Sequence, residues 1–120
     1  MANRIGHVEL TTPDVPRARS FYTALLGWQF EDHPMPGGDG IYAMAHPDGG
    51  AAAGMLTSPP GAPTGWTMFV NVDDIKSTMP KARDLGAVVV RDVTEVPGYG
   101  SFAVVADPTG AVFGLWQTKR

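Results

Sequence analysis

The sequence predicts an α+β fold in which one strand–helix–strand–strand–strand unit occurs twice within a single domain of 120 residues. Three observations predict it. The two halves share a phrase, "PDGGAAAGML" at 47–56 and "DPTGAVFGLW" at 107–116. The same order of strand and helix patterns runs through both halves, and a Pro/Gly-rich link, "SPPGAPTG" at 58–65, lies between them.

The repeat has an offset of 60 residues. Placing residues 1–60 on 61–120 without gaps aligns ten identical residues, where this composition predicts roughly four by chance. The matched glycines Gly54 and Gly114 each interrupt an otherwise good strand pattern. The order of the local patterns, taken with these identities, indicates a duplicated unit.

The first half reads as a strand, a helix and three strands. "RIGHVELTT" alternates as a half-buried strand does, and Asp14 then caps a helix that runs to about Leu26. Pro16 fits the first turn of this helix and Gly27 ends it. The remaining strands, separated by a loop at 33–40 and a turn at 47–50, are predicted at 28–32, 41–46 and 51–57.

The second half repeats this order. "WTMFVNV" reads as a strand, Asp73 or Asp74 caps a helix, and "DLG" closes it. Pro80 falls in the middle of this helix, where it removes one hydrogen bond, so we expect a kinked or shortened helix. Further strands are predicted at 87–93, 101–106 and 111–117.

Neither half can bury both faces of a four-stranded sheet alone. We therefore expect the halves to join into one curved mixed sheet, with helices on its outer face and a cleft along its inner face. The domain spans 1–120, and its predicted parts are a first module at about 4–57, a linker at 58–64 and a second module at about 65–118.

Composition excludes several classes of protein. A net charge of −3 gives no electrostatic reason to expect nucleic acid or an anionic membrane as partner. The chain has no cysteine, which excludes disulfides and thiolate metal sites and fits a cytoplasmic location. The opening "MANRIGHVEL" lacks the apolar segment of a secretory signal, and no apolar run approaches the roughly 20 residues of a membrane span.

Three stretches of the chain resemble the vicinal oxygen chelate superfamily, which includes glyoxalases, bleomycin-resistance proteins, fosfomycin-resistance enzymes and extradiol dioxygenases. They are "HVELTTPDVPRARSFYTALLGW" at 7–28, "FVNVDDIKSTMPKARDLGA" at 69–87 and, most strongly, "YGSFAVVADPTGAVFGLWQ" at 99–117. The resemblance implies paired βαβββ modules in the glyoxalase/bleomycin resistance fold, a cleft between them and frequent homodimers. It does not by itself fix the reaction.

Members of this family that use a metal take ligands from four pseudo-symmetric strand positions. Matched motif by motif, these positions read His7, Gly54, Thr67 and Gly114 in this sequence. A catalytic metal site usually needs about three histidine or carboxylate ligands, and glycine offers none. Glu9 could add a second ligand beside His7, but a third is lacking. We therefore expect no metal site and no cofactor.

Two interpretations of the paired glycines remain open. Glycine permits close backbone approach, so Gly54 and Gly114 could empty the place where the metal usually lies and make room for a bulkier organic ligand. Alternatively, they could relieve crowding where the sheet bends.

His7 and Glu9 are the best candidates for chemistry, because a carboxylate near an imidazole can raise its pKa and hold its tautomer. Their Cα atoms would be about 6.6 Å apart on one strand face. His7 could equally be a relic that hydrogen-bonds within the sheet. Tyr99 lies in a glycine-rich loop that, like residues 36–40, could close over the cleft. The predicted ligand-binding residues are His7, Glu9, Thr11, Tyr42, Met55, Trp66, Thr67, Phe69, Tyr99, Phe102 and Trp116.

The function that these observations favour is binding of a small, largely apolar or aromatic molecule in the cleft of a homodimeric, cytoplasmic protein. The alternative is an enzyme of the same family, a lyase, isomerase or dioxygenase, that works with a metal or by acid–base chemistry through His7 and Glu9. A module that binds a protein partner is a third possibility.

Overall fold

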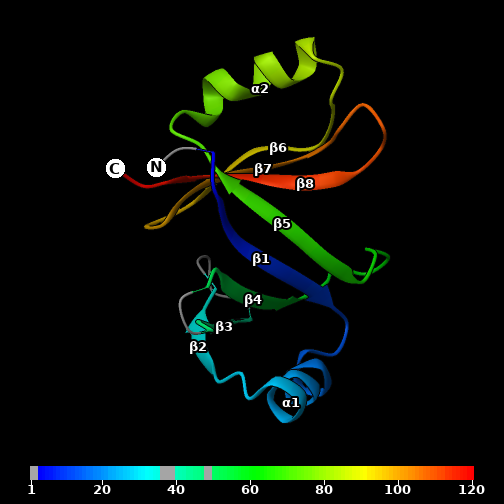
Figure 1. Cartoon of the computed structure of the whole chain (residues 1–120), viewed down its shortest axis with the longest axis vertical. Coiled ribbons are helices and arrows are strands. Elements are labelled where there is room, and N and C mark those ends of the chain that lie inside the picture. The colour runs from blue at the N-terminus through cyan, green and yellow to red at the C-terminus, as the bar shows by residue number, and fades with distance from the viewer. Residues whose placement is uncertain (1–2, 36–39, 48–49) are drawn as a thin grey trace. The chain divides into compact units, whose positions relative to one another are not determined.

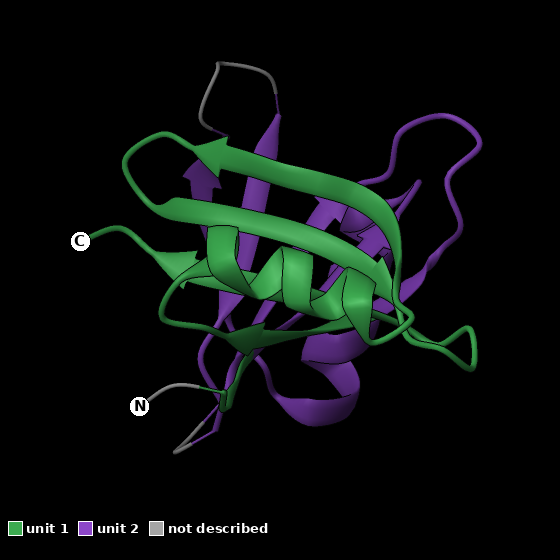
Figure 2. Cartoon of the chain, turned by 90° about the horizontal axis from the view of Figure 1, so that it is seen from above, with its two compact units in different colours: residues 1–6, 67–120 green, residues 7–66 purple. Residues whose placement is uncertain are grey.

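The computed structural model describes residues 3–35, 40–47 and 50–120. It divides into two compact units, residues 7–66 and residues 1–6 with 67–120, which Figure 2 draws in different colours. We call residues 7–66, purple and unit 2 in the key of Figure 2, the first unit, and residues 1–6 with 67–120, green and unit 1 in that key, the second unit. The expected loop at 33–40 and turn at 47–50 each fall partly outside the described residues.

The first unit has the predicted order of strand, helix and three strands (Figure 1). Strand β1 pairs in parallel with β4, and β3 is antiparallel to both β2 and β4, so the spatial order is β2-β3-β4-β1. The elements are β1 (Ile5–Thr12), α1 (Val15–Leu26), β2 (Phe30–Pro34), β3 (Ile41–Ala45) and β4 (Ala52–Thr57).

The second unit repeats this topology. Strand β5 pairs in parallel with β8, and β7 is antiparallel to both β6 and β8, which gives the order β5-β8-β7-β6. The elements are β5 (Gly65–Asn71), α2 (Ile75–Asp84), β6 (Val88–Val96), β7 (Gly100–Ala106) and β8 (Val112–Thr118). The α+β class and the duplicated βαβββ order are confirmed.

The start of the chain belongs to the second unit, although the sequence places the first module at about 4–57. The amide of Asn71 donates to the carbonyl of Arg4 over 2.9 Å, which ties residues before His7 to the end of β5. Module boundaries drawn from the sequence repeat therefore differ from the compact units at this point.

The helix ends follow the capping signals in the sequence. The Asp14 side chain accepts from the amide of Arg17 at the start of α1, and Gly27 ends the helix in the left-handed conformation with φ of 71°. In the second unit Asp74 is the N-cap. Helix α2 continues through Pro80 but has 10 residues against 12 in α1, as expected for a helix with an internal proline.

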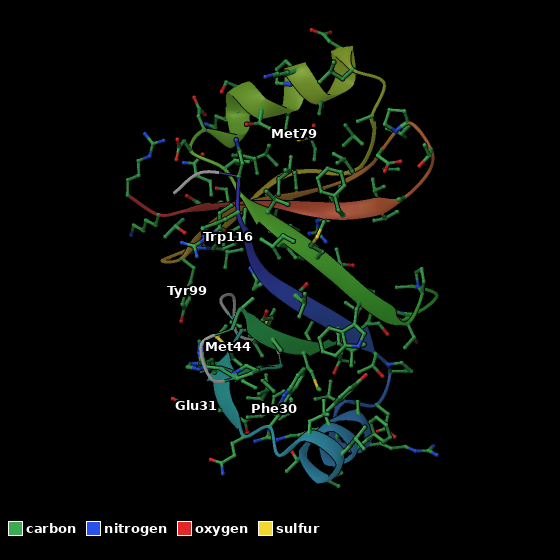
Figure 3. The ribbon with its side chains drawn as sticks, viewed as in Figure 1. Phe30, Glu31, Met44, Met79, Tyr99 and Trp116 are labelled. Carbon is green, nitrogen blue, oxygen red and sulfur yellow. The ribbon has the colours of Figure 1, made fainter. Side chains whose placement is uncertain are left out.

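Each unit has its own core between helix and sheet. In the first unit Leu10, Ala43 and Met55 are buried, and α1 packs against them through Val15 and Ala18. In the second unit α2 contributes Ile75 and Met79 (Met79 is labelled in Figure 3), which pack with Val72, Ala103, Val105 and Leu115. In the described part of the chain, neither helix has both the length and the apolar character needed to cross a bilayer.

Candidate functional site

The polar centre of the first unit is a hydrogen bond between Tyr42 and Glu9. Glu9 lies opposite Gly54 in the pairing of β1 with β4, and Tyr42 comes from the next strand, β3. The Tyr42 hydroxyl donates to Glu9 Oε1 over 3.0 Å. Because strand side chains alternate, Glu9 lies on the sheet face opposite Leu10 and Met55, which α1 covers. The structure therefore joins two of the predicted ligand-binding residues.

The geometry explains why a glycine occurs at the same place in each half. A Cβ atom at Gly54 would lie 1.9 Å from the Tyr42 hydroxyl oxygen, and one at Gly114 would lie 2.2 Å from Cε2 of Phe69. Of the two interpretations left open, the one in which these glycines make room for a ligand is wrong, since an aromatic ring of the protein lies against each of them. Both glycines allow a ring to approach the strand backbone closely.

Burial shifts the pKa values of the two candidate catalytic residues, Glu9 and His7, in opposite directions. It raises the pKa of Glu9, and the hydrogen bond from Tyr42 offsets part of that rise. It lowers the pKa of His7, two residues earlier on the same strand face. Burial and the nearby Glu9 carboxylate raise the pKa of Tyr42, which keeps its hydroxyl protonated as a donor. A neutral imidazole and a carboxyl group titrating closer to neutrality are the states that proton transfer uses.

Three other predicted residues of the first unit make contacts of their own. Met55 is fully buried in the core beneath α1, so it does not share the face of Glu9. Trp66 packs beside α1, where its indole Nε1 donates to the hydroxyl of Tyr22 over 3.0 Å. The Thr11 hydroxyl donates to the carbonyl of Pro63 in the link between the modules, over 3.4 Å. Core packing thus accounts for Met55, whereas Trp66 is 39% exposed and is held by its hydrogen bond to Tyr22.

The corresponding face of the second unit is aromatic where the first is polar. The 60-residue offset places Phe69 at the position of Glu9 and Phe102 at that of Tyr42. Their rings meet edge to face with centroids 6.5 Å apart. Trp116 lies directly opposite Phe102 in the pairing of β7 with β8, and Figure 3 labels it. The structure therefore gathers three predicted aromatic residues of this unit on one face of the sheet, where Phe69 is buried and Phe102 and Trp116 are half-buried.

The sequence interpretation missed the cation on this aromatic surface. The Arg91 guanidinium lies 5.3 Å from the centroid of the Phe102 ring, a cation–π geometry. Irregularities in the pairing of β6 with β7, on both sides of Arg91, place this residue opposite Val104. The alternation of residues along a strand does not reveal such bulges, so the sequence could not predict the position of Arg91.

The last two predicted residues, Thr67 and Tyr99, differ in setting. Thr67 is half-buried on β5. Tyr99 lies in the turn before β7 with 54% of its surface exposed, and its carbonyl accepts from the amide of Lys119 over 2.8 Å. This turn is therefore tied to the end of β8. The other predicted loop, 36–40, lies outside the described residues except for Gly40.

Two of the four family ligand positions, His7 and Gly54, are in the first unit, and Thr67 and Gly114 are in the second. The donor set fits a divalent metal poorly, since two positions have no side-chain donor and the rings of Tyr42 and Phe69 lie over them. Within residues 3–35, 40–47 and 50–120, no three histidine or carboxylate side chains are grouped closely enough to hold a metal.

A cavity of about 310 Å³ in the second unit involves none of the predicted site residues. It lies at the start of α2, where the Asp74 side chain accepts from the amide of Lys76. Its lining residues are Asn3, Val72, Asp73, Asp74, Ser77, Thr78 and Lys81.

Comparison with known proteins gives the family. Residues 4–115 match the model of the glyoxalase/bleomycin resistance protein/dioxygenase superfamily. CFP32 of Mycobacterium tuberculosis, provisionally named a glyoxylase, is 40% identical over 94% of this chain and 45% of its own length. The anthracycline biosynthesis protein DnrV of Streptomyces peucetius is 31% identical over 91% of this chain, again with 45% of its own length covered.

The chain thus spans about half the length of these curated relatives. Among solved structures, methylmalonyl-CoA epimerase of Streptomyces coelicolor superposes with a TM-score of 0.70 at 17% identity, covering 100% of both chains. A Bacillus halodurans protein, BH1468, superposes with a TM-score of 0.77 at 13% identity, covering 100% of this chain and 97% of its own. The sequence matches and the βαβββ repeat agree, and the chain belongs to the glyoxalase/bleomycin resistance protein/dioxygenase superfamily.

Proposed function

We propose that this protein binds a small organic molecule with a hydrogen-bond donor, such as a phenol, through the Glu9–Tyr42 pair and without the family's usual metal. The observation that carries the proposal is the 3.0 Å hydrogen bond from Tyr42 to Glu9 beside Gly54. At a position that supplies a metal ligand in metal-using relatives, this chain has a glycine with a phenol ring against it. The site is therefore arranged around a carboxylate acceptor rather than around a cation.

The chemistry of the pair supports this class of ligand. Glu9 is half-buried, so a donor from the ligand would compensate a carboxylate that has lost much of its water. The Tyr42 hydroxyl fixes one carboxylate oxygen and so limits the orientations of the other. In the second unit the partly exposed Phe102, with the buried Phe69 packed against it, separately offers an apolar contact for an aromatic group. A relative named for anthracycline biosynthesis agrees with an aromatic organic ligand.

Titration with a panel of phenols and matched aromatic methyl ethers tests the proposal, with binding measured by calorimetry or tryptophan fluorescence. We expect phenols to bind and the ethers to bind more weakly. Glu9→Gln should weaken phenol binding about tenfold or more, since a hydrogen bond to a charged group contributes about 1.5–3 kcal/mol. Glu31→Gln, which alters an exposed carboxylate on β2, is the matched control. Absence of phenol binding across a broad panel would refute the proposal. An equal loss of phenol affinity in Glu9→Gln and Glu31→Gln would also refute it.

The second candidate function is metal-free acid–base catalysis by His7 and Glu9. The opposite pKa changes that burial causes at these neighbouring positions favour it. His7→Ala should then abolish turnover of a bound compound while leaving its binding intact.

The other alternative, a metal-dependent lyase, isomerase or dioxygenase, is tested by elemental analysis of the protein after nickel, zinc, manganese and iron are offered. Stoichiometric, tightly held metal would overturn the metal-free proposal.

A cytoplasmic location of the protein remains a prediction.

A further inference from the structure

The sheet face of the second unit that lies opposite α2 carries a cation over an aromatic ring. Two residues of β7, Ala103 and Val105, are buried in the core beneath α2. Because strand side chains alternate, Phe102 and Val104 lie on the other face. Arg91 lies opposite Val104 in the pairing of β6 with β7, and its guanidinium lies over the Phe102 ring. The cation therefore shares the sheet face of Phe102.

The charge of Arg91 has no carboxylate partner in the part of the chain that the structure describes. Its Nε donates to the hydroxyl of Thr94 over 3.4 Å, which is a long hydrogen bond. The adjacent Asp92 pairs instead with Arg83, also over 3.4 Å. Since Arg91 is exposed, its terminal N–H groups are accessible to an anion from solution.

Another arginine of the chain shows what a fully partnered cation over a ring looks like. Arg19 lies over the ring of Phe30, 5.7 Å from the ring centroid. It pairs with Asp32 over 2.5 Å and donates to the carbonyl of Phe30 over 2.8 Å. The partners of Arg19 thus belong to its own unit, whereas Arg91 has neither a carboxylate nor a carbonyl partner among the described residues.

The duplicated unit shows that the fold does not require a cation at this place. At the 60-residue offset the counterpart of Arg91 is Glu31, which is labelled in Figure 3. Glu31 lies opposite Met44 in the pairing of β2 with β3, and Met44 is the counterpart of Val104. The same sheet position therefore accepts either charge, and the arginine is not needed to form the βαβββ unit.

The neighbours of Arg91 indicate the class of anion that it would bind. Arg91 covers part of the half-buried Phe102 ring, and Trp116, directly opposite Phe102 on β8, extends the aromatic surface. These rings favour a ligand that is itself aromatic. The planar guanidinium presents parallel N–H donors that match the two oxygens of a carboxylate.

We propose that this face of the second unit binds an aromatic carboxylate, with Arg91 holding the carboxylate and the rings of Phe102 and Trp116 contacting the aromatic group. The inference rests on the proposed function in that the ligand is a small organic molecule. It uses neither residue of the Glu9–Tyr42 pair, so each proposal can fail without the other.

The test compares benzoate and phenylacetate with their methyl esters near neutral pH, with binding measured by calorimetry or tryptophan fluorescence. Neither the ionised acids nor the esters have a hydrogen-bond donor for Glu9, so the comparison isolates the negative charge. Wild type should bind each acid about tenfold more tightly than its ester, as a charge-assisted hydrogen bond provides. This preference should weaken as potassium chloride is added, because salt screens exposed charges.

Substitutions at Arg91 should change this preference and leave ester binding intact. Arg91→Gln should remove the preference for the acids. Arg91→Lys should keep part of it, because lysine retains the charge and loses the planar fork. Arg83→Gln removes the same charge from an exposed position of α2 in the same unit and should keep the full preference. Arg91 is exposed, so its variants should fold, and circular dichroism checks this.

Three results would overturn the inference: acids and esters that bind wild type equally or not at all, a preference unchanged in Arg91→Gln, or an equal loss in Arg83→Gln. If Arg91→Gln fails to fold, Arg91→Lys and the salt dependence decide, and a preference that neither changes overturns the inference. Phenols that bind through Glu9 while acids show no preference would refute this inference alone. Preferred binding of acids, with phenol affinity unchanged in Glu9→Gln, would support it and refute the proposed function.

Discussion

Replacing Gly54 with alanine should destabilise the protein by acting on the Tyr42–Glu9 hydrogen bond. The new Cβ atom would lie 1.9 Å from the Tyr42 hydroxyl oxygen, where ordinary contact begins at 3.4 Å, so the two must separate by about 1.5 Å. The ring extends from β3 over Gly54 of β4 to Glu9 on β1, so it cannot move this far and keep the 3.0 Å hydrogen bond. Overpacking costs about 1–3 kcal/mol, and a buried carboxylate that loses its donor costs about 1–3 kcal/mol more.

We therefore expect Gly54→Ala to lower the free energy of unfolding by about 2–6 kcal/mol, measured by urea titration with circular dichroism. The decisive comparison uses Tyr42→Ala, which removes the ring. In that background Gly54→Ala should cost less than about 1 kcal/mol, because alanine suits a strand better than glycine once space exists. Equal costs in the two backgrounds would refute the conclusion that the phenol ring is the reason for glycine at this position.

Three further predictions concern charge and backbone. Burial raises the pKa of Glu9, so the native state holds its proton longer than the unfolded state, and stability falls as pH rises from the unfolded pKa of about 4.5 through the folded value. In Glu9→Gln the free energy of unfolding, measured by urea titration, should no longer fall over this pH range. A pH profile of the variant equal to that of the wild type would contradict the prediction. Pro80→Ala should stabilise α2 by about 1–3 kcal/mol, because it restores a helix donor at an exposed position, and thermal melts measure the gain. Asp107 accepts hydrogen bonds, at 2.8 and 2.7 Å, from the amide and hydroxyl of Thr109 and, at 3.1 Å, from the amide of Ala111, which lowers its pKa. The stabilisation by the Asp107 carboxylate is present above its unfolded pKa of 3.8 and is lost as pH falls through its lower pKa in the folded state. Asp107→Ala should lower the melting temperature at neutral pH and approach the wild type in acid.

The candidate site could be predicted from the sequence only in part. Strand alternation placed His7 and Glu9 on one face, and the repeat picked out Gly54 and Gly114 as equivalent positions. The partner of Glu9 is Tyr42, 33 residues away, and no local pattern indicates that hydrogen bond. For the same reason the sequence left open whether the paired glycines make room for a ligand, and only the positions of the Tyr42 and Phe69 rings decided it.

Met55 and Trp66 show why the sequence alone could not separate ligand-binding residues from packing residues among the apolar candidates. Both belong to residue types that fit either a ligand surface or a core. Only the packing of α1, which buries Met55 and holds Trp66 through Tyr22, distinguishes these roles. Burial depends on which elements cover a face, and a single strand pattern does not record it.

The sequence by itself determined the duplication, the order of elements and the helix ends, because alternation and capping act between residues close together in the chain. Asp14, Gly27 and Asp74 perform the roles that those local interactions require. Tertiary structure alone decided that Tyr42 fixes Glu9, that Phe69 lies against Gly114, and that the Arg91 guanidinium lies over the Phe102 ring. These outcomes depend on contacts between distant segments, whose geometry is set by strand register and helix packing rather than by neighbours in sequence.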